Sequence, residues 1–231
     1  EYFYVKVPLT PDGYIAARQL STDGVPINYT LGFSARQNYL AARLSHPRFV
    51  NVFLGRLNQL VEENGLGKPE NVGEKTALAS FEAVENVRKS EVGVFTYQIA
   101  ASLRSGDQVA KLAGVDVLTI PPKVAQEYLD MDVSRHNVRR HTVDELQVEL
   151  NAGRTVESRA LSQLWEIDPQ FIAFVEDAVK QADQMRSGRD LVELSNRHNV
   201  NLFYDWSTMD REKIRANGKI PTLALWPGVP V

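Results

Sequence analysis

Polar side chains stand at the carboxyl ends of four segments whose composition predicts β-strands. Residues two apart on a strand share a face of the sheet, and parallel α/β folds place their sites at these strand ends. Taken singly, each group also has a structural explanation, such as an asparagine that caps a loop or an arginine on the surface. In chain order the groups are Lys6, Asn28 with Thr30, Asn51 with Phe53, and Ser102 with Arg104.

Lys6 is the candidate with the most specific chemistry, because its neighbours in Tyr2–Pro8 are aromatic, β-branched or proline. Lysine is almost never fully buried without a partner, and removal from water favours the neutral amine. A neutral amine attacks a carbonyl carbon to form a Schiff base. The alternative is a lysine on an edge strand that reaches solvent. The residues alone leave both interpretations open.

The elements that would position these groups alternate along the chain. Each strand–helix–strand step needs a crossover, which predicts a parallel sheet covered by helices. A doubly wound sheet and a (β/α)₈ barrel both fit this order. No GxGxxG or GxxxxGK[ST] motif follows a strand, which excludes the usual nucleotide-binding loops. The predicted strands are 2–7, 26–31, 49–54, 95–100 and 115–120, and the predicted helices are 14–21, 35–44, a segment around 77–84, and 107–112.

The character of the chain changes near residue 131. Thr142–Glu145 has the form of a capping box that opens a helix, and helical spacing of apolar residues covers 171–185 and 190–197. We therefore divide the chain into βα units over residues 1–130 and a mostly helical extension, packed on them, over residues 131–231.

Composition excludes several classes of protein. With 26 Lys and Arg against 29 Asp and Glu, the formal net charge is −3, which argues against a dedicated nucleic-acid binder. The chain has no cysteine, so a thiolate nucleophile and Cys-ligated metal are excluded. No apolar run reaches the roughly 18 residues of a membrane span, and no signal peptide is predicted. We expect a reducing cytoplasmic location, although an organelle matrix would fit the same composition.

Several motifs together resemble the transaldolase family in order and spacing. The resemblance covers roughly residues 4–125 and is loose in the tail. The segments that carry it are Val5–Thr10 with Asp12-Gly13, Asn28–Ser34, Phe53–Leu57, Ala101–Arg104 and Leu118–Pro122.

The resemblance implies a (β/α)₈ TIM barrel and class I aldolase chemistry with no metal and no organic cofactor. Lys6 matches the family's Schiff-base lysine on the fourth strand. This chain would then supply about five βα units, from the fourth to the eighth strand, followed by the helical extension.

The resemblance also implies roles for the residues around Lys6. Asn28 matches a substrate-binding asparagine, and Thr30 matches the threonine that helps to hold the catalytic water. Asn51 stands where the family usually has serine, and it could still bond a sugar hydroxyl. Phe53 matches transaldolases, because the related fructose-6-phosphate aldolases tend to have tyrosine there.

A phosphate group would bind at the other end of the substrate. Arg104 with Ser102 matches the family's phosphate-binding pair, and Arg56 matches a second arginine. The fixed fork of a guanidinium binds phosphate oxygens bidentately.

The family's first three strands, which carry its general acid/base carboxylate, are missing from this sequence. Asp12 is expected to start a helix and Asp116 lies at the wrong end of its strand, so neither replaces that carboxylate. Five strands cannot close a barrel, and both outer strands would keep unpaired edges. We expect the missing strands to come from the same or another polypeptide.

These observations predict an enzyme that transfers a dihydroxyacetone unit from a ketose phosphate to an aldose phosphate. The donor would be sedoheptulose 7-phosphate or fructose 6-phosphate, in the pentose phosphate pathway. The expected partners are sugar phosphates and the missing strands, without nucleic acid or membrane, and a homodimer is left open. One alternative is a related class I aldolase. The other is a non-catalytic transaldolase-like subunit that binds a sugar phosphate or a partner.

Overall fold

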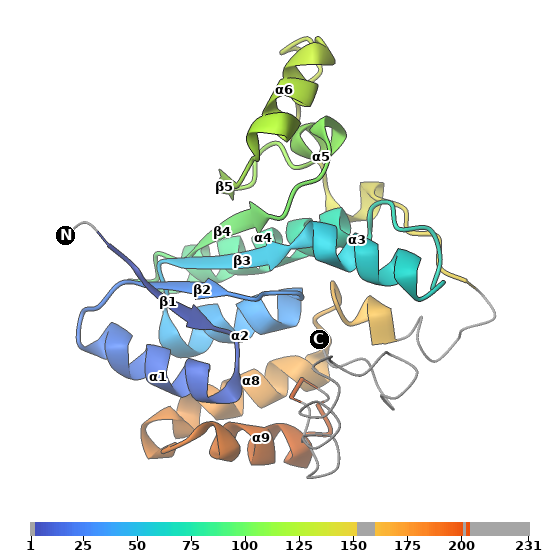
Figure 1. Cartoon of the computed structure of the whole chain (residues 1–231). Helices are drawn as coiled ribbons and strands as arrows, with labels where there is room; N and C mark the ends of the chain where they lie inside the picture. Colours follow the sequence, from blue (N-terminus) through green and yellow to red (C-terminus); the bar gives the residue numbers. More distant parts are fainter. Residues whose placement is uncertain (1–2, 152–159, 201, 204–231) are drawn as a thin grey trace, which may run out of the picture.

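The computed structural model describes residues 3–151, 160–200 and 202–203. Its strands form one parallel sheet in the order of the sequence, β1-β2-β3-β4-β5 (Figure 1). A parallel α/β architecture is thereby confirmed. The strands are β1 (Val5–Pro8), β2 (Ile27–Thr30), β3 (Phe49–Phe53), β4 (Tyr97–Ala101) and β5 (Val117–Leu118).

Each parallel step is made by helices that begin soon after the preceding strand. Labels follow Figure 1. The helices are α1 (Pro11–Thr22), α2 (Ala35–Ser45), α3 (Leu54–Glu63), α4 (Val72–Ser90), α5 (Gly106–Lys111), α6 (Pro122–Asp130), α8 (Pro169–Gln181) and α9 (Gly188–Arg197), with short 3₁₀ turns η1 (Val143–Glu145) and η2 (Ala182–Gln184).

Side chains that accept hydrogen bonds from free N–H groups fix where several helices start. Thr10 accepts from Gly13 N before α1, and Ser34, predicted as the N-cap of α2, accepts from Gln37 N. Such caps satisfy donors that the first turn of a helix leaves unpaired. α2 therefore begins within a residue of the sequence prediction.

The alternation of side chains gives the sheet two different sides. Val7, Tyr29 and Val50 are buried with α1 and α2 in one apolar cluster, while Val52 and Ala100 are buried with α3 and α4 in another. We call this the helix side. The neighbouring residues along each strand point to the opposite side, which we call the solvent side.

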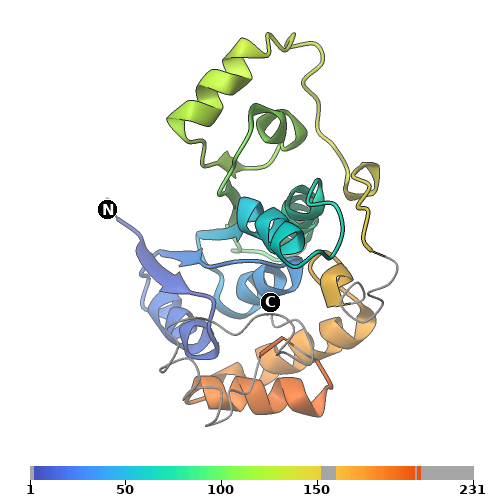
Figure 2. The same ribbon diagram turned by 45° about the vertical axis from the view of Figure 1, so that its right-hand side comes forward.

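The extension after residue 131 packs mainly on the first two helices. α9 contacts α1 and α8 contacts α2, and Phe171, Phe174 and Leu191 are fully buried in the cluster that contains α1 and α2. β5, α5 and α6 lie at the far end of the molecule from α8 and α9 (Figures 1 and 2). The division of the chain at residue 130 remains a prediction.

Two helices have no counterpart in the sequence prediction. α3 starts directly after β3 with Phe53 at its N-cap and no side-chain cap, so it carries no polar start signal. α6 begins at Pro122, which we had interpreted as a stop after the fifth strand. Proline is favoured in the first turn of a helix, where its missing N–H is not needed.

Two other predictions were wrong in extent. β5 covers only Val117–Leu118 instead of 115–120, since its ladder to β4 comprises two register pairs. The predicted capping box at Thr142 opens only the three-residue η1, and its side chain makes no capping hydrogen bond. In the described part of the chain, no helix is long and apolar enough to cross a membrane.

Both ends of the sheet are open in this structure. Within the described residues, β1 pairs only with β2 and β5 pairs only with β4. Each outer strand therefore has one edge whose ladder is unpaired, as the sequence predicted.

Candidate active site

Lys6 and Asn28 lie side by side on the solvent side of the sheet. They are register partners in the parallel β1–β2 pair, and Pro8 and Thr30 form the pair nearest the carboxyl ends of these strands. Asn28 Oδ1 is buried and accepts no hydrogen bond from any described residue. An unsatisfied buried acceptor is costly, so this oxygen is a candidate ligand atom on the residue that pairs with Lys6 across the two strands.

The Lys6 side chain is exposed, so in this structure the alternative of a lysine on an edge strand holds instead of an apolar enclosure. The reason is its position on an outer strand, whose second edge is unpaired among the residues that the structure describes. The Lys6 amine also has no hydrogen-bond or ion-pair partner in that part of the chain. Shielding of this amine would therefore have to come from polypeptide beside β1.

Asn51 is buried, and both of its side-chain polar groups are already used. Its Nδ2 donates to Tyr29 O at 2.5 Å, and its Oδ1 accepts from Gly32 N at 3.3 Å. Each of these atoms keeps one further donor or acceptor site, but both are already held by backbone groups of the β2 strand and its loop. The contact of Asn51 with a sugar hydroxyl stays a prediction, while the structure shows that Asn51 links β3 to β2 and to the loop after it.

Phe53 forms an aromatic wall at the carboxyl end of β3. Its half-buried ring meets the ring of Phe33 edge to face, with the centroids 6.0 Å apart. Phe33 in turn packs against the apolar cluster that contains Leu161 and Leu164. Leu161 and Leu164, which belong to the extension after residue 131, therefore support this wall.

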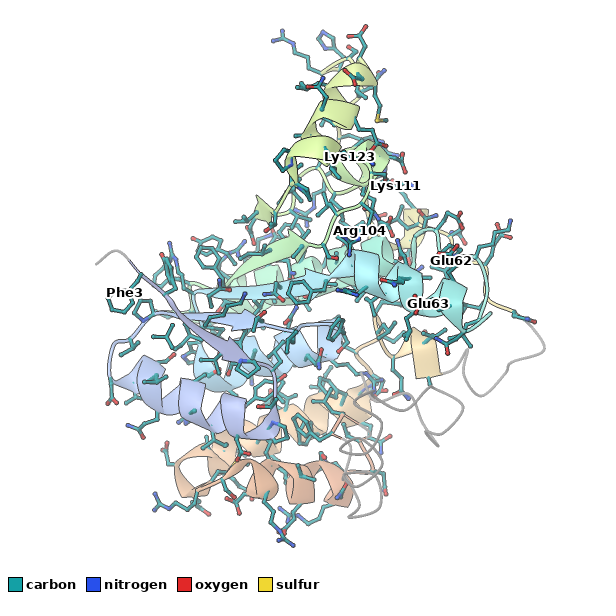
Figure 3. The ribbon with its side chains drawn as sticks, in the orientation of Figure 1. Phe3, Glu62, Glu63, Arg104, Lys111 and Lys123 are labelled. Carbon is teal, nitrogen blue, oxygen red and sulfur yellow. The ribbon has the colours of Figure 1, made fainter. Side chains whose placement is uncertain are left out.

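Arginine side chains gather where β3 and β4 pass into helices. Arg56 lies in the first turn of α3, and Arg104 follows β4 directly. Both side chains are exposed, and neither guanidinium is paired with another described residue. Figure 3 shows Arg104 below Lys111, at the passage from β4 to α5. Two unpaired guanidinium groups beside a helix N-terminus suit a phosphate group.

Gly55 allows Arg104 to lie against α3. A Cβ at position 55 would come within 2.1 Å of Ser102 O and 2.9 Å of Arg104 Cγ. The loop after β4 is also held by Gln108, whose Oε1 accepts from Arg104 N at 2.6 Å. Gln108 is not among the predicted site residues. Its spacing from Ser105 is nevertheless that of a capping box, and the structure contains this capping box.

Two residues at these strand ends have strained backbones. Leu31, after β2, and Ser102, after β4, have φ values of 60° and 66°. Residues other than glycine rarely adopt this left-handed conformation, and such strain clusters at functional sites. Ser102 and Leu31 therefore mark the same edge of the sheet as Lys6, Asn28 and Arg104.

A cavity of about 520 Å³ between α3, α4 and α5 lies beside Arg104 but does not suit a phosphate. Arg104 and Lys111 are its cations, and Lys111 pairs with Asp107. Five carboxylates line it, and Figure 3 shows two of them, Glu62 and Glu63, at the end of α3. Among the described residues, no group of three metal-ligating side chains could hold a metal ion.

Comparison with known proteins adds to this geometry. The sequence pattern of the family described as "Transaldolase/Fructose-6-phosphate aldolase" matches residues 1–190. The chain belongs to this family. The match runs well past residue 125, where we expected the resemblance to weaken, and includes all of α8.

Curated relatives support the assignment. A "Probable transaldolase" of Nitrosopumilus maritimus is 32% identical over 133 residues, which are 57% of this chain and 54% of that protein. A second, of Roseobacter denitrificans, is 36% identical over 131 residues, 55% of this chain and 52% of that protein. A third, of Ruegeria pomeroyi, is 38% identical over 124 residues, which are 52% of this chain and 49% of that protein. The matched part of this transaldolase-family chain spans about half the length of these relatives.

The two carboxylates considered as acid/base replacements in this transaldolase-family chain have structural partners. Asp12 accepts from Gly188 N at 2.7 Å in the first turn of α1, and Asp116 forms a bidentate pair with Arg88. Both were predicted not to serve as the general acid/base. On the solvent side of the five strands, the described residues include no Asp or Glu.

Proposed function

We propose that the protein transfers a dihydroxyacetone unit from a ketose phosphate to an aldose phosphate through a Schiff base on Lys6. Fructose 6-phosphate and sedoheptulose 7-phosphate are the proposed donors, in the pentose phosphate pathway. The observation that carries the proposal is the pairing of Lys6 with Asn28 on the solvent side of a transaldolase-family sheet. A cytoplasmic location remains a prediction.

In the proposed reaction, the neutral Lys6 amine attacks C2 of the ketose and water leaves, giving an iminium. A base removes the proton of the C4 hydroxyl, the C3–C4 bond breaks, and an aldose phosphate departs as its aldehyde. The electron pair of that bond enters the iminium and leaves an enamine. The enamine carbon attacks the acceptor aldehyde, whose oxygen gains a proton, and water then releases the new ketose from Lys6.

The buried oxygen of Asn28 supports this chemistry, since it can accept a hydrogen bond from a substrate hydroxyl beside C2. Thr30, two register pairs further along β2, is proposed to hold the water that carries protons. Phe53 offers no hydroxyl for proton transfer, which favours the transferase over an aldolase that releases dihydroxyacetone. Arg56 and Arg104, with Ser102, are proposed to hold the substrate phosphate.

We propose further that the five strands are the fourth to eighth of a (β/α)₈ barrel. The unpaired edges of β1 and β5 and the coverage of about half of each relative support this. Polypeptide between those edges, from the same or another chain, would enclose Lys6. It would also supply the acid/base carboxylate that the described solvent side lacks.

An assay of transfer from fructose 6-phosphate to erythrose 4-phosphate by the full-length protein tests the proposal. The wild type and Lys123→Met, which changes an exposed lysine of α6, should be active, and Lys6→Met should be inactive. Release of free dihydroxyacetone without transfer would favour a class I aldolase. Sugar-phosphate binding with neither reaction would favour the non-catalytic subunit.

A further inference from the structure

The β2–β3 junction differs from the other strand pairs that surround the site. β1 and β2 share four register pairs and β3 and β4 share five, whereas β2 and β3 share only Asn28–Phe49. The two strands therefore separate just where their polar residues begin, between Asn28 and the carboxyl edge.

The side-chain amide of Asn51 fills the space between the separated strands. Nδ2 donates to Tyr29 O, the carbonyl between Asn28 and Thr30, and Oδ1 accepts from Gly32 N in the loop after β2. One amide thus takes the place of a backbone peptide in the interrupted ladder. Buried backbone groups need such partners, because leaving one unpaired is costly.

Further contacts close the junction beyond Asn51. Phe53 N donates to Gly32 O at 2.9 Å, and Asn38 Nδ2 donates to Asn51 O at 3.0 Å from α2. A Cβ at Gly32 would lie 1.8 Å from Asn51 O. The loop is therefore clamped against β3, and Leu31 takes its strained left-handed φ of 60° immediately before the clamp.

We propose that Asn51 is a positioning residue, which sets the separation of β2 from β3 and thereby places Lys6, Asn28 and Thr30, joined by the β1–β2 ladder, relative to the carboxyl end of β3. The inference rests on the proposed function and differs from the substrate contact that the resemblance implies for this position. A serine hydroxyl can also donate and accept, but it is a single oxygen on a shorter side chain, and we expect it to lose at least one of the two hydrogen bonds that the amide makes.

Asn51→Ser and Asn51→Ala separate this role from substrate binding. If Asn51 positions β2, both variants of the full-length protein lose kcat on the order of 100-fold, because small displacements of reacting groups are that costly. The KM for fructose 6-phosphate should stay within a few-fold of the wild type. If Asn51 bonds a sugar hydroxyl, serine should restore activity and alanine should raise KM, and that result would overturn the proposal.

Hydrogen exchange and NMR keep the test independent of folding and of turnover. The Gly32 amide should exchange faster in Asn51→Ser than in wild type, and unchanged protection would contradict the proposed clamp. On wild type, fructose 6-phosphate should shift the side-chain amide resonance of Asn28 more than that of Asn51, and the reverse order would also contradict it. A wild-type protein without transferase activity would refute the proposed function instead, while the exchange result would still decide whether Asn51 holds the loop.

Discussion

At the scale of single residues, close backbone contacts decide where the charged groups of the site lie. A Cβ atom at Gly55 or at Gly32 would come too close to a backbone oxygen of a neighbouring segment, so neither position has room for a side chain. Both positions stand where a loop from one βα unit meets the next. The placement of Arg104 and of the β2–α2 loop thus depends on residues that carry no chemistry themselves.

Gly55→Ala should weaken binding of a phosphorylated substrate. The added Cβ must displace Ser102 O or the Arg104 side chain, and hydrogen bonds to a charged group contribute about 1.5–3 kcal/mol, so KM should rise about 10-fold or more. Steady-state kinetics with fructose 6-phosphate checks this. Gly24→Ala is the matched control, since a Cβ at Gly24, which has a positive φ, would have no atom within 4 Å. An equal rise in KM in Gly24→Ala would refute the explanation that the Cβ at position 55 displaces Arg104.

Arg104→Met should affect only the phosphate end of the substrate. We expect KM for fructose 6-phosphate to rise about 10-fold or more, for the same electrostatic reason. Trapping of unphosphorylated dihydroxyacetone on Lys6 should keep its wild-type rate. A loss of that trapping would mean that Arg104 supports the fold of the site instead of binding phosphate.

At the scale of elements, the extension is joined to the βα units by arginines of α1 and α2. Arg36, nearly buried, donates to Glu166 O at 2.7 Å and to Asp168 Oδ2 at 2.5 Å, and it lies over the Phe171 ring. Asp168 also caps α8 through Phe171 N. The start of α8 and the first turn of α2 are therefore linked by one guanidinium.

Arg36→Met should lower the free energy of unfolding by about 1–3 kcal/mol, because the Glu166 carbonyl and the carboxylate that caps α8 lose a charged, buried donor. Urea denaturation of the purified protein measures this change. Arg189→Met is the control, since the Arg189–Glu193 pair is exposed and such pairs contribute at most about 0.5 kcal/mol. Equal effects of the two substitutions would show that the Arg36 link is unimportant for stability.

The cap of α9 should make stability depend on pH. Hydrogen bonds from the backbone N–H groups of Arg186 and Ser187 lower the pKa of Asp190. A lowered pKa in the folded state gives stability that is complete above the unfolded value, about 3.9, and is lost as pH falls through the folded value. Thermal unfolding between neutral pH and pH ~3 should show a smaller decrease in Tm for Asp190→Asn than for wild type. Parallel pH profiles would exclude this contribution.

At the scale of the whole molecule, the sheet formed by the described residues is open at both edges, and the proposed Schiff-base lysine stands on one of them. Lys6 and the aromatic residues Phe3 and Tyr4 before it are exposed. Figure 3 shows Phe3 at the opposite end of the sheet from Arg104. A partner that covers this edge would bury Lys6 and satisfy the unpaired side of β1.

Hydrogen exchange should locate that partner. In the 231-residue chain alone, amides of β1 should exchange much faster than those of β3, which is paired on both sides. In a protein that also contains the proposed neighbouring strands, protection of β1 and β5 should rise while that of β3 changes little. Equal protection of β1 in both forms would mean that no further strand pairs with it.

The sequence revealed those parts of the fold that depend on local patterns. Four strands appear near their predicted positions, because apolar residues alternate along them and turn residues bound them. Ser34 correctly predicted the start of α2, because it has the residue type of an N-cap. α3 could not be found this way, since Phe53 provides no polar cap. The hydrogen bonds of Asn51 within the protein could not be predicted from the sequence either, because its partners, Tyr29 O and Gly32 N, are backbone groups. Their position depends on how β2 and β3 separate.

Borohydride reduction of the full-length protein with fructose 6-phosphate, followed by mass spectrometry of the peptide that contains Lys6, tests the central claim most directly. We predict a reduced dihydroxyacetone or ketose phosphate adduct on Lys6, and none in Lys6→Met. An adduct on another lysine, or an unmodified Lys6 in a protein that binds the sugar phosphate, would contradict a Schiff base at this position.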